Sequence, residues 1–209
     1  MKNKLIRISD SPNLKSILFK LPIWNYELVK IRNPKEPVCG LTSKTFDNRH
    51  IICLDYDLID RSVVLGDIIM LKDLIKPALV YLFTTYEEKD ELGIKGNYHV
   101  LILDKFGFRE AESIMSLTHS DSIHRILANR SRYRSWVIRI SKKGNRESPK
   151  LIKAWNFNGK RENSLAHYLL LKTLYPHKVD VKGVLFDKYT ETTITHYNSA
   201  SKLKIEDIK

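Results

Sequence analysis

Two carboxylates placed two residues apart are the first candidates for chemistry. Asp55 and Asp57 directly follow the apolar run at residues 51–54, which has the pattern of a buried strand. Side chains two apart on a strand share one face, with Cα atoms about 6.5–7 Å apart. Such a pair suits the hard divalent cations that nucleotidyl transfer requires. The alternative is that the pair simply ends a turn or faces water.

A histidine opens a second apolar strand. Residues 96–103 read Gly-Asn-Tyr-His-Val-Leu-Ile-Leu, so His99 follows a turn marked by Gly96. From this position the imidazole can point toward the same end of the sheet as Asp55 and Asp57 and donate to a phosphate. A surface histidine beside a plain hairpin turn is the alternative.

The third feature is a basic segment between Asp121 and Glu147. It holds eight cations and no acid: Arg125, Arg130, Arg132, Arg134, Arg139, Lys142, Lys143 and Arg146. Tyr133 and Trp136 lie among them and either stack on bases or fill the core. Arg139, Ser141 and Lys143 alternate along an expected strand and offer donors to phosphates. A solvated surface is the alternative, but uncompensated cations repel one another, and we therefore favour a nucleic acid or nucleotide contact.

Composition agrees with a polyanionic partner. The 209 residues include Lys+Arg 36 and Asp+Glu 24, a formal net charge of +12. With 43% hydrophobic and 29% charged residues the chain is globular in character. The longest apolar runs, at 78–83 and 98–103, are far shorter than the roughly 20 residues that cross a bilayer. Two cysteines exclude a disulfide framework and a Cys-rich zinc site. We expect a soluble, cytoplasmic, single-domain protein with no membrane association.

Periodicity and turn residues predict the elements that position these groups. We expect helices at 62–76, 108–117 and 163–175, and loops at 31–40 and 85–95. The expected strands are 49–57, 78–84, 98–103, 135–140 and 151–157, with a terminal hairpin at 184–189 and 192–197. Several connections are so short that only antiparallel pairing fits them. The sequence therefore predicts an α+β fold, a mixed and mostly antiparallel sheet with packed helices.

In this order the three features resemble the catalytic core of the archaeo-eukaryotic primase superfamily, which includes the primase-polymerases. Residues 53–57 (Cys-Leu-Asp-Tyr-Asp) match its strand ending in Asp-x-Asp. Residues 96–100 (Gly-Asn-Tyr-His-Val) match its histidine motif, with Asn97 where the family often has Ser. The third motif of the family is an acid followed by a basic stretch that often reads Arg, Ser, Lys. Residues 120–124 match the acid, and residues 136–144 match the basic stretch. The resemblance covers about residues 49–155 of one expected domain, 1–209.

The resemblance implies a two-lobed core with an RNA-recognition-like sheet. It implies an enzyme that uses Mg²⁺ or Mn²⁺ and nucleoside triphosphates to begin or extend a strand on single-stranded DNA. By position, Asp55 and Asp57 would bind metal, with Asp121 as the third carboxylate and Asp104 as its rival. The incoming phosphates would be bound by His99, Arg139, Ser141 and Lys142 or Lys143. The nucleic acid would be contacted by Arg130, Arg132, Arg134, Tyr133 and Trp136.

Other interpretations stay open at this point. The same residues suit a catalytically inactive nucleic-acid-binding accessory protein or a metal-dependent nuclease. A replicative helicase acting in trans, in a prokaryotic or viral setting, is a candidate partner. His119 and His124 flank Asp121 and together offer ligands to a transition metal. Gly-x-Ser-x-Gly and P-loop motifs are absent from the sequence.

Overall fold

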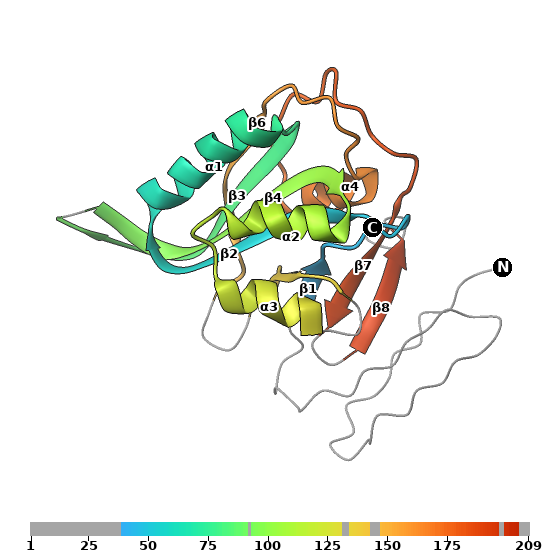
Figure 1. The fold of residues 1–209 in the computed structure, drawn as a ribbon. Coiled ribbons are helices and arrows are strands. Elements are labelled where there is room, and N and C mark those ends of the chain that lie inside the picture. Colours follow the sequence, from blue (N-terminus) through green and yellow to red (C-terminus); the bar gives the residue numbers. More distant parts are fainter. Residues whose placement is uncertain (1–38, 92, 131–133, 143–146, 197–198, 205–209) are drawn as a thin grey trace, which may run out of the picture.

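The computed structural model describes residues 39–91, 93–130, 134–142, 147–196 and 199–204 (Figure 1). These residues form an α+β fold, as the sequence predicted. The elements, in chain order, are β1 (Cys39–Thr42), β2 (His50–Asp60), α1 (Arg61–Ile75), β3 (Leu79–Asp90), β4 (Gly93–Phe106), α2 (Phe108–Ser116), α3 (Ser122–Arg130), β5 (Val137–Arg139), β6 (Lys150–Asn156), α4 (Leu165–Leu174), β7 (Glu191–His196) and β8 (Ser199–Lys204).

The first sheet carries the apolar runs that precede Asp55 and follow His99. Its strand order is β2-β4-β3-β6, and each neighbouring pair is antiparallel. Because β4 lies between β2 and β3, those two strands run parallel to each other. Helix α1 connects them, so β2, α1 and β3 form a split β-α-β unit.

Helices α1 and α2 pack on one face of this sheet (Figure 1). Helix α1 buries Val64, Ile68 and Leu71, which recur at helical spacing. On β2, Tyr56 points to this face, because its hydroxyl donates to Asp67 of α1 (3.0 Å). Successive strand residues point to opposite faces, so Asp55 is directed away from the two helices.

A second sheet and helix α4 complete the fold. The order of the second sheet is β5-β1-β7-β8, again with antiparallel neighbours. The first sheet packs against aromatic side chains that follow α4, with the rings of Phe83 and Tyr175 4.9 Å apart. His167 of α4 donates through Nε2 to the Thr42 carbonyl of β1 (2.9 Å). Helix α4 therefore contacts β1 of the second sheet, and the chain just beyond the helix contacts the first.

The predicted loop at 85–95 is wrong, because β3 and β4 continue as a hairpin that projects from the sheet (Figure 1). Their register runs on to Asp90 opposite Gly93. Residues 87–91 form an unbroken charged run on a two-stranded ribbon that projects from the sheet, so the segment lacks the apolar alternation that marks a strand. Gly96 permits this ribbon, because a Cβ there would lie 2.2 Å from the Tyr86 carbonyl oxygen. The glycine is thus required by a close backbone approach.

Strand pairing was predicted less well than the strands themselves. The expected partnership of 135–140 with 151–157 is wrong, because β5 pairs with β1 and β6 pairs with β3. The terminal hairpin exists but is displaced along the chain, since β7 pairs with β8. Strand β1 begins within the expected loop 31–40, and α3 was not predicted. Local patterns determine whether a segment is extended, whereas its partner is chosen by contacts far apart in sequence.

A buried lysine anchors the end of β4. The Lys105 side chain is fully buried, and its Nζ lies 2.6 Å from Asp187, 2.9 Å from Asp47 and 3.1 Å from Glu162. Arg49 joins the cluster through ion pairs with Asp47 and Glu162. Asp47 and Arg49 lie just ahead of β2, so the cluster fixes β4 relative to the start of β2.

Candidate functional site

The candidate site forms where β2 lies beside β4. Asp55 and His99 are partners in the register of these strands, and His99 Nε2 lies 3.3 Å from Asp55 Oδ1. On the other edge of β2, the Asp55 carbonyl accepts a hydrogen bond from the Asp121 amide (2.7 Å). Because the Asp55 carbonyl points away from β4, Asp55 and His99 form a non-hydrogen-bonded antiparallel pair. In such a pair the two side chains lie closer together. The prediction that Asp55 and His99 share one location is therefore confirmed.

Two further side chains flank the Asp55 carboxylate. His124 of α3 places Nδ1 4.0 Å from Asp55 Oδ2, so each carboxylate oxygen faces one imidazole. Burial alone would raise the pKa of Asp55. The hydrogen bond from His99 and the charges of His99, His124 and Arg139 outweigh burial and lower that pKa below its ordinary value. Asp55 is therefore ionised at neutral pH, and 27% of its side chain remains exposed.

His124 is nearly enclosed, with 12% of its side chain exposed. Burial lowers its pKa below the usual value, although Asp55 and Asp121 act in the opposite direction. Within the described residues, His124 Nε2 and His99 Nδ1 are buried polar atoms that lack a hydrogen-bond partner.

Asp57 lies where β2 changes course. The register between β2 and β4 shifts just after Tyr56, and Leu58 adopts a positive φ of 51°. The Leu58 amide donates to Asn97 Oδ1 (2.7 Å), so Asn97 holds the irregularity in place. Asp57 is exposed at this point. Asn97, which stands where the primase pattern often has Ser, thus sets the course of the strand that carries Asp57.

Of the two candidates for a third carboxylate, Asp121 is the one beside Asp55. Its amide contacts the Asp55 carbonyl, as described above. Its carboxylate accepts hydrogen bonds from the amides of Ile123 (2.8 Å) and His124 (3.3 Å) at the start of α3. Asp121 therefore has the geometry of a helix N-cap residue.

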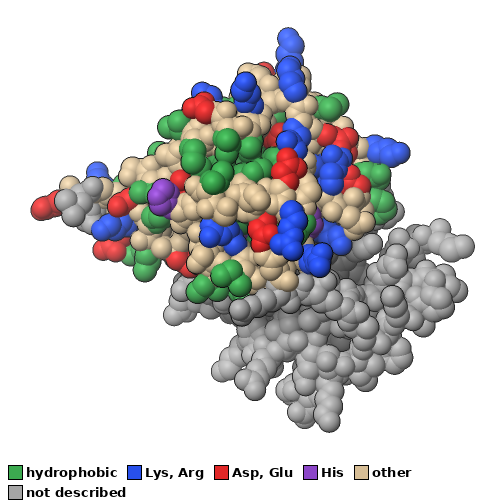
Figure 2. All heavy atoms as spheres, in the orientation of Figure 1, with side chains coloured by type: hydrophobic (Ala, Val, Ile, Leu, Met, Phe, Trp, Pro, Cys, Tyr) green, Lys and Arg blue, Asp and Glu red, His purple; other side chains and the backbone are tan. Residues whose placement is uncertain are grey.

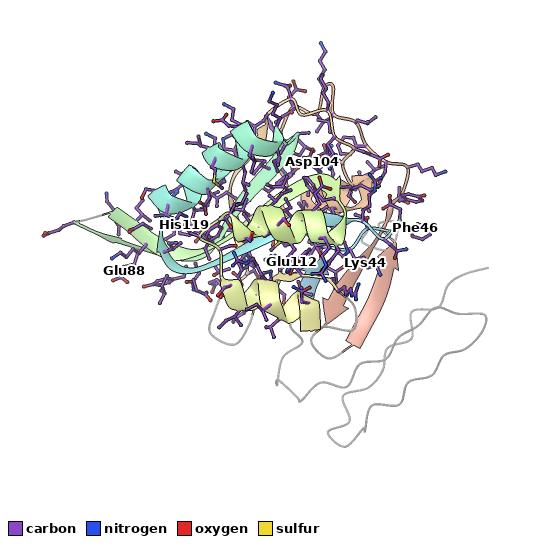
Figure 3. The ribbon with its side chains drawn as sticks, in the orientation of Figure 1. Lys44, Phe46, Glu88, Asp104, Glu112 and His119 are labelled. Atoms are coloured by element: carbon purple, nitrogen blue, oxygen red, sulfur yellow. The ribbon has the colours of Figure 1, made fainter. Side chains whose placement is uncertain are left out.

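Asp104 lies elsewhere. It is five residues beyond His99 on β4, which places it on the opposite face of the sheet. Figure 3 shows it well away from the projecting hairpin that carries Glu88. Its side chain is fully buried and accepts a hydrogen bond from the Ala78 amide (2.9 Å). Burial raises the pKa of Asp104 to about 6. Asp104 is therefore a core carboxyl group and is removed as a rival to Asp121.

Arg139, at the end of β5, acts on Asp55 through its positive charge, which lowers the pKa of that carboxyl group. Its Nη1 donates to the carbonyls of Ser141 and Glu147, the latter at 2.8 Å. Strand β5 ends at Arg139, so Ser141 follows the strand and does not alternate along it as predicted. Lys142 is exposed just beyond Ser141, and Lys143 lies outside the described residues.

The other residues predicted to contact nucleic acid are scattered. Arg130 is the last residue of α3, and Arg134 is exposed with a φ of 44°. Arg132 and Tyr133 lie outside the described residues. Trp136 is 1% exposed, and its ring stacks on Phe108 at 4.8 Å. The alternative that Trp136 fills the core is therefore correct, and its ring has no free face for a base.

His119 and His124 turn to different carboxylates. His119 Nδ1 lies 2.9 Å from Asp67 Oδ1, and the His119 amide donates to Asp67 Oδ2 (2.8 Å). Asp67 belongs to α1, on the helix-covered face of the sheet, whereas His124 faces Asp55. Their interpretation as a shared transition-metal pair is not supported by this arrangement. Figure 3 shows His119 at the surface, and 67% of its side chain is exposed.

The surface gives a further constraint on the nucleic-acid interface. Figure 2 shows one face of the molecule, on which Lys and Arg side chains alternate with Asp and Glu. The excess of positive charge is therefore not collected into a single patch on this face. Near the site, the positive charge that acts on Asp55 is that of Arg139.

His124 and Asn97 are the site residues whose places the sequence did not predict. For His124 a signal existed: Asp121 precedes Ile123, Ile126 and Leu127, a capping residue followed by apolar residues at helical spacing. That pattern predicts α3, but Ile123, Ile126 and Leu127 are 63%, 47% and 58% exposed, so it does not predict that His124 faces the strand. For Asn97 we find no local signal, because its partner Leu58 is distant in sequence.

Comparison with known proteins adds no assignment: no family model, curated protein or solved structure matches the chain. Among the described helices, none has the length and apolar character needed to span a membrane. Within the described part of the chain, no three His, Cys, Asp or Glu side chains are grouped so as to hold a metal ion by themselves.

Proposed function

We propose that this protein is a template-dependent nucleotidyltransferase, a DNA primase or primase-polymerase that begins or extends strands on single-stranded DNA. The observation that carries the proposal is the contact between Asp55 and His99 (3.3 Å from Nε2 to Oδ1), with the charge of Arg139 acting on the same carboxylate. These residues come from β2, β4 and β5, which belong to two different sheets. They are the acid, the histidine and the arginine of the three motifs that resemble the primase pattern.

The fold supports the same proposal. The elements β2, α1, β3, β4 and α2 follow one another in the chain, with β4 between β2 and β3 in the sheet. This is the arrangement of a split β-α-β unit, from which RNA-recognition-like sheets are built. Asp55 and His99 lie on the face opposite α1 and α2. A substrate would reach this face at Asp55, which is 27% exposed, because His99 is only 9% exposed and Phe83 beside it packs on Tyr175.

The residues fit a divalent ion that is shared with a substrate. Mg²⁺ keeps several waters and is commonly bound by one or two carboxylates together with phosphates, so it does not need a cage made of protein alone. Asp55 is ionised and partly exposed, and Asp57 is exposed two residues along the same strand. This donor set agrees with the absence, among the described side chains, of a three-residue metal group.

The bound ions would neutralise triphosphate oxygens and make the attacking 3′-hydroxyl more acidic. Asp55 supplies a carboxylate that remains ionised without a metal, because His99 and Arg139 stabilise its charge. His99 and Arg139 supply hydrogen-bond donors beside that carboxylate, suited to phosphate oxygens. Lys142, exposed beyond β5, adds a mobile positive charge at the same end of the basic segment.

The proposal is tested by incubating the full chain with single-stranded template, with and without primer, labelled nucleotides and Mg²⁺ or Mn²⁺. We expect labelled products from the wild type and at least a roughly 100-fold loss in Asp55→Ala, because a carboxylate that holds the ions has no substitute. Asp73→Ala is the matched control, since Asp73 is exposed on α1. The same gel reports a nuclease as a shortened template.

Binding measurements complete the test. Template affinity that falls steeply with salt, persists in EDTA and is accompanied by no product would favour the accessory-protein alternative. A wild type that makes no product over a broad range of templates and metals would refute the proposal, and so would an Asp55→Ala variant with full activity.

A further inference from the structure

The contacts of Asp121 suggest a role that differs from the one the primase resemblance implies. Its amide donates to the Asp55 carbonyl (2.7 Å), which fixes the chain beside β2. Its two carboxylate oxygens accept from the amides of Ile123 and His124, at 2.8 and 3.3 Å. The Arg125 amide donates to the Asp121 carbonyl (3.3 Å), which begins the helical hydrogen bonds of α3. Asp121 therefore both starts α3 and anchors its first turn to β2.

The first turn of α3 carries His124 back onto the site. Because Asp121 fixes the helix start, the His124 side chain lies against Asp55, with Nδ1 4.0 Å from Oδ2. His99 contacts Oδ1 from the other side at 3.3 Å. The Asp55 carboxylate thus lies between two imidazoles, with His99 the nearer of the two.

We propose that Asp121 and His124 are positioning residues: Asp121 caps α3 and thereby places His124 against Asp55, and Asp121 is not a third metal ligand. The inference rests on the proposed function, in which Asp55 is a metal ligand. Two observations support it. Both Asp121 oxygens are engaged by helix amides, and no trio of acids or histidines within the described residues is grouped for a metal.

Substitutions at position 121 separate a cap from a ligand. Asn and Ser cap helices about as well as Asp but have no carboxylate. Ala neither caps a helix well nor has a carboxylate. If Asp121 acts as a cap, Asp121→Asn and Asp121→Ser keep Mn²⁺ affinity within about threefold of the wild type. Asp121→Ala and His124→Ala are then expected to weaken it by about 10-fold, as is common for residues that orient a metal ligand.

The double variant tests whether Asp121 acts through His124. If it does, Asp121→Ala combined with His124→Ala weakens Mn²⁺ binding no more than either change alone, because both remove the same contact. If the two residues contribute independently, the fold losses in Mn²⁺ affinity of the single variants would instead multiply in the double variant. Circular dichroism shows that each variant folds, and Asp73→Ala is the matched control at an exposed acid.

The experiment is a titration of the full-length protein with Mn²⁺ alone, followed by electron paramagnetic resonance of the free ion, with Asp55→Ala as the reference for loss. Mn²⁺ binding lost in Asp121→Asn and Asp121→Ser as fully as in Asp55→Ala overturns this inference and leaves the proposed function standing. A double variant whose loss of Mn²⁺ affinity equals the product of the two single losses overturns the inference as well.

A second readout needs no metal. The His124 imidazole resonances in NMR are expected to shift strongly in Asp55→Asn and in Asp121→Ala, and to shift much less in Asp121→Asn, which removes the Asp121 charge but keeps the helix cap. Shifts of this kind in a protein that binds no Mn²⁺, either alone or with a nucleoside triphosphate present, would overturn the proposed function and support the placement of His124. Unchanged His124 resonances in Asp121→Ala would overturn the placement itself.

Discussion

Replacing Lys105 by Met should produce a large loss of stability that depends on pH. The lysine is fully buried among Asp47, Glu162 and Asp187, at distances of 2.9, 3.1 and 2.6 Å. Methionine matches its length but leaves three carboxylates near one another, and Arg49 pairs with two of them, Asp47 and Glu162. Removing one partner from a buried ion cluster commonly costs about 3–5 kcal/mol. We expect a loss of that size at pH 7.

The pH dependence has a definite sign. Burial alone would raise the pKa of Asp47 and Glu162, but hydrogen bonds from Lys105 and Arg49 hold both below their usual values. Groups with a depressed pKa stabilise the fold above their unfolded pKa, near 4, and lose this contribution as the pH falls below it. The difference between wild type and Lys105→Met should therefore be greatest at pH 7 and shrink toward pH 3.

The measurement is urea unfolding at pH 7, 5 and 3, with Lys95→Met as a control at an exposed lysine. Lys95→Met is expected to change the free energy of unfolding by less than about 0.5 kcal/mol. A loss below about 1 kcal/mol in Lys105→Met at pH 7 would refute the reasoning. So would a loss that is the same at pH 7 and pH 3.

Two further predictions concern the same sheet and helix. Gly96→Ala should cost about 1–3 kcal/mol, because its Cβ would meet the Tyr86 carbonyl at 2.2 Å; Gly66→Ala, with open space in α1, should instead gain about 0.5–1 kcal/mol. At pH 8 the free energy of unfolding of Asp104→Asn should be up to about 3 kcal/mol greater than that of the wild type, because burial raises the pKa of Asp104 from 3.8 to about 6. That gain should vanish below pH 4, where the wild-type carboxyl is protonated in both states. Urea unfolding measures both effects. Changes in the free energy of unfolding of the same sign in Gly96→Ala and Gly66→Ala would contradict the first prediction, and an Asp104→Asn gain that does not depend on pH would contradict the second.

The sequence predicted the elements of the site better than their connections. Apolar runs beside Asp55 and His99 specify strands locally, and α1, α2 and α4 follow from helical spacing and their bounding Pro and Gly residues. The fold class follows from the short connections. The register that sets Asp55 opposite His99 depends on contacts between β2 and β4 that join residues distant along the chain, such as Leu58 and Asn97, which are 39 residues apart.

Side-chain burial was the harder problem. Trp136 stands in a basic segment, where its ring could as well have met a base, and only packing against Phe108 and His50 determines that it belongs to the core. The charged residues of the β3–β4 hairpin hid its strands, because a ribbon open to water needs no apolar face. The role of Asp121 could be read locally from the cap pattern, but its contact with the Asp55 backbone could not.

Crystallography of the full chain with Mn²⁺ and a non-hydrolysable nucleoside triphosphate tests the central claim most directly. Anomalous scattering at the manganese edge locates the ion independently of the phosphates. We predict a peak about 2.1 Å from carboxylate oxygens of Asp55 and Asp57, with the triphosphate against His99 and Arg139. Manganese and triphosphate bound elsewhere, with the Asp55 carboxylate bare between its two imidazoles, would contradict the account.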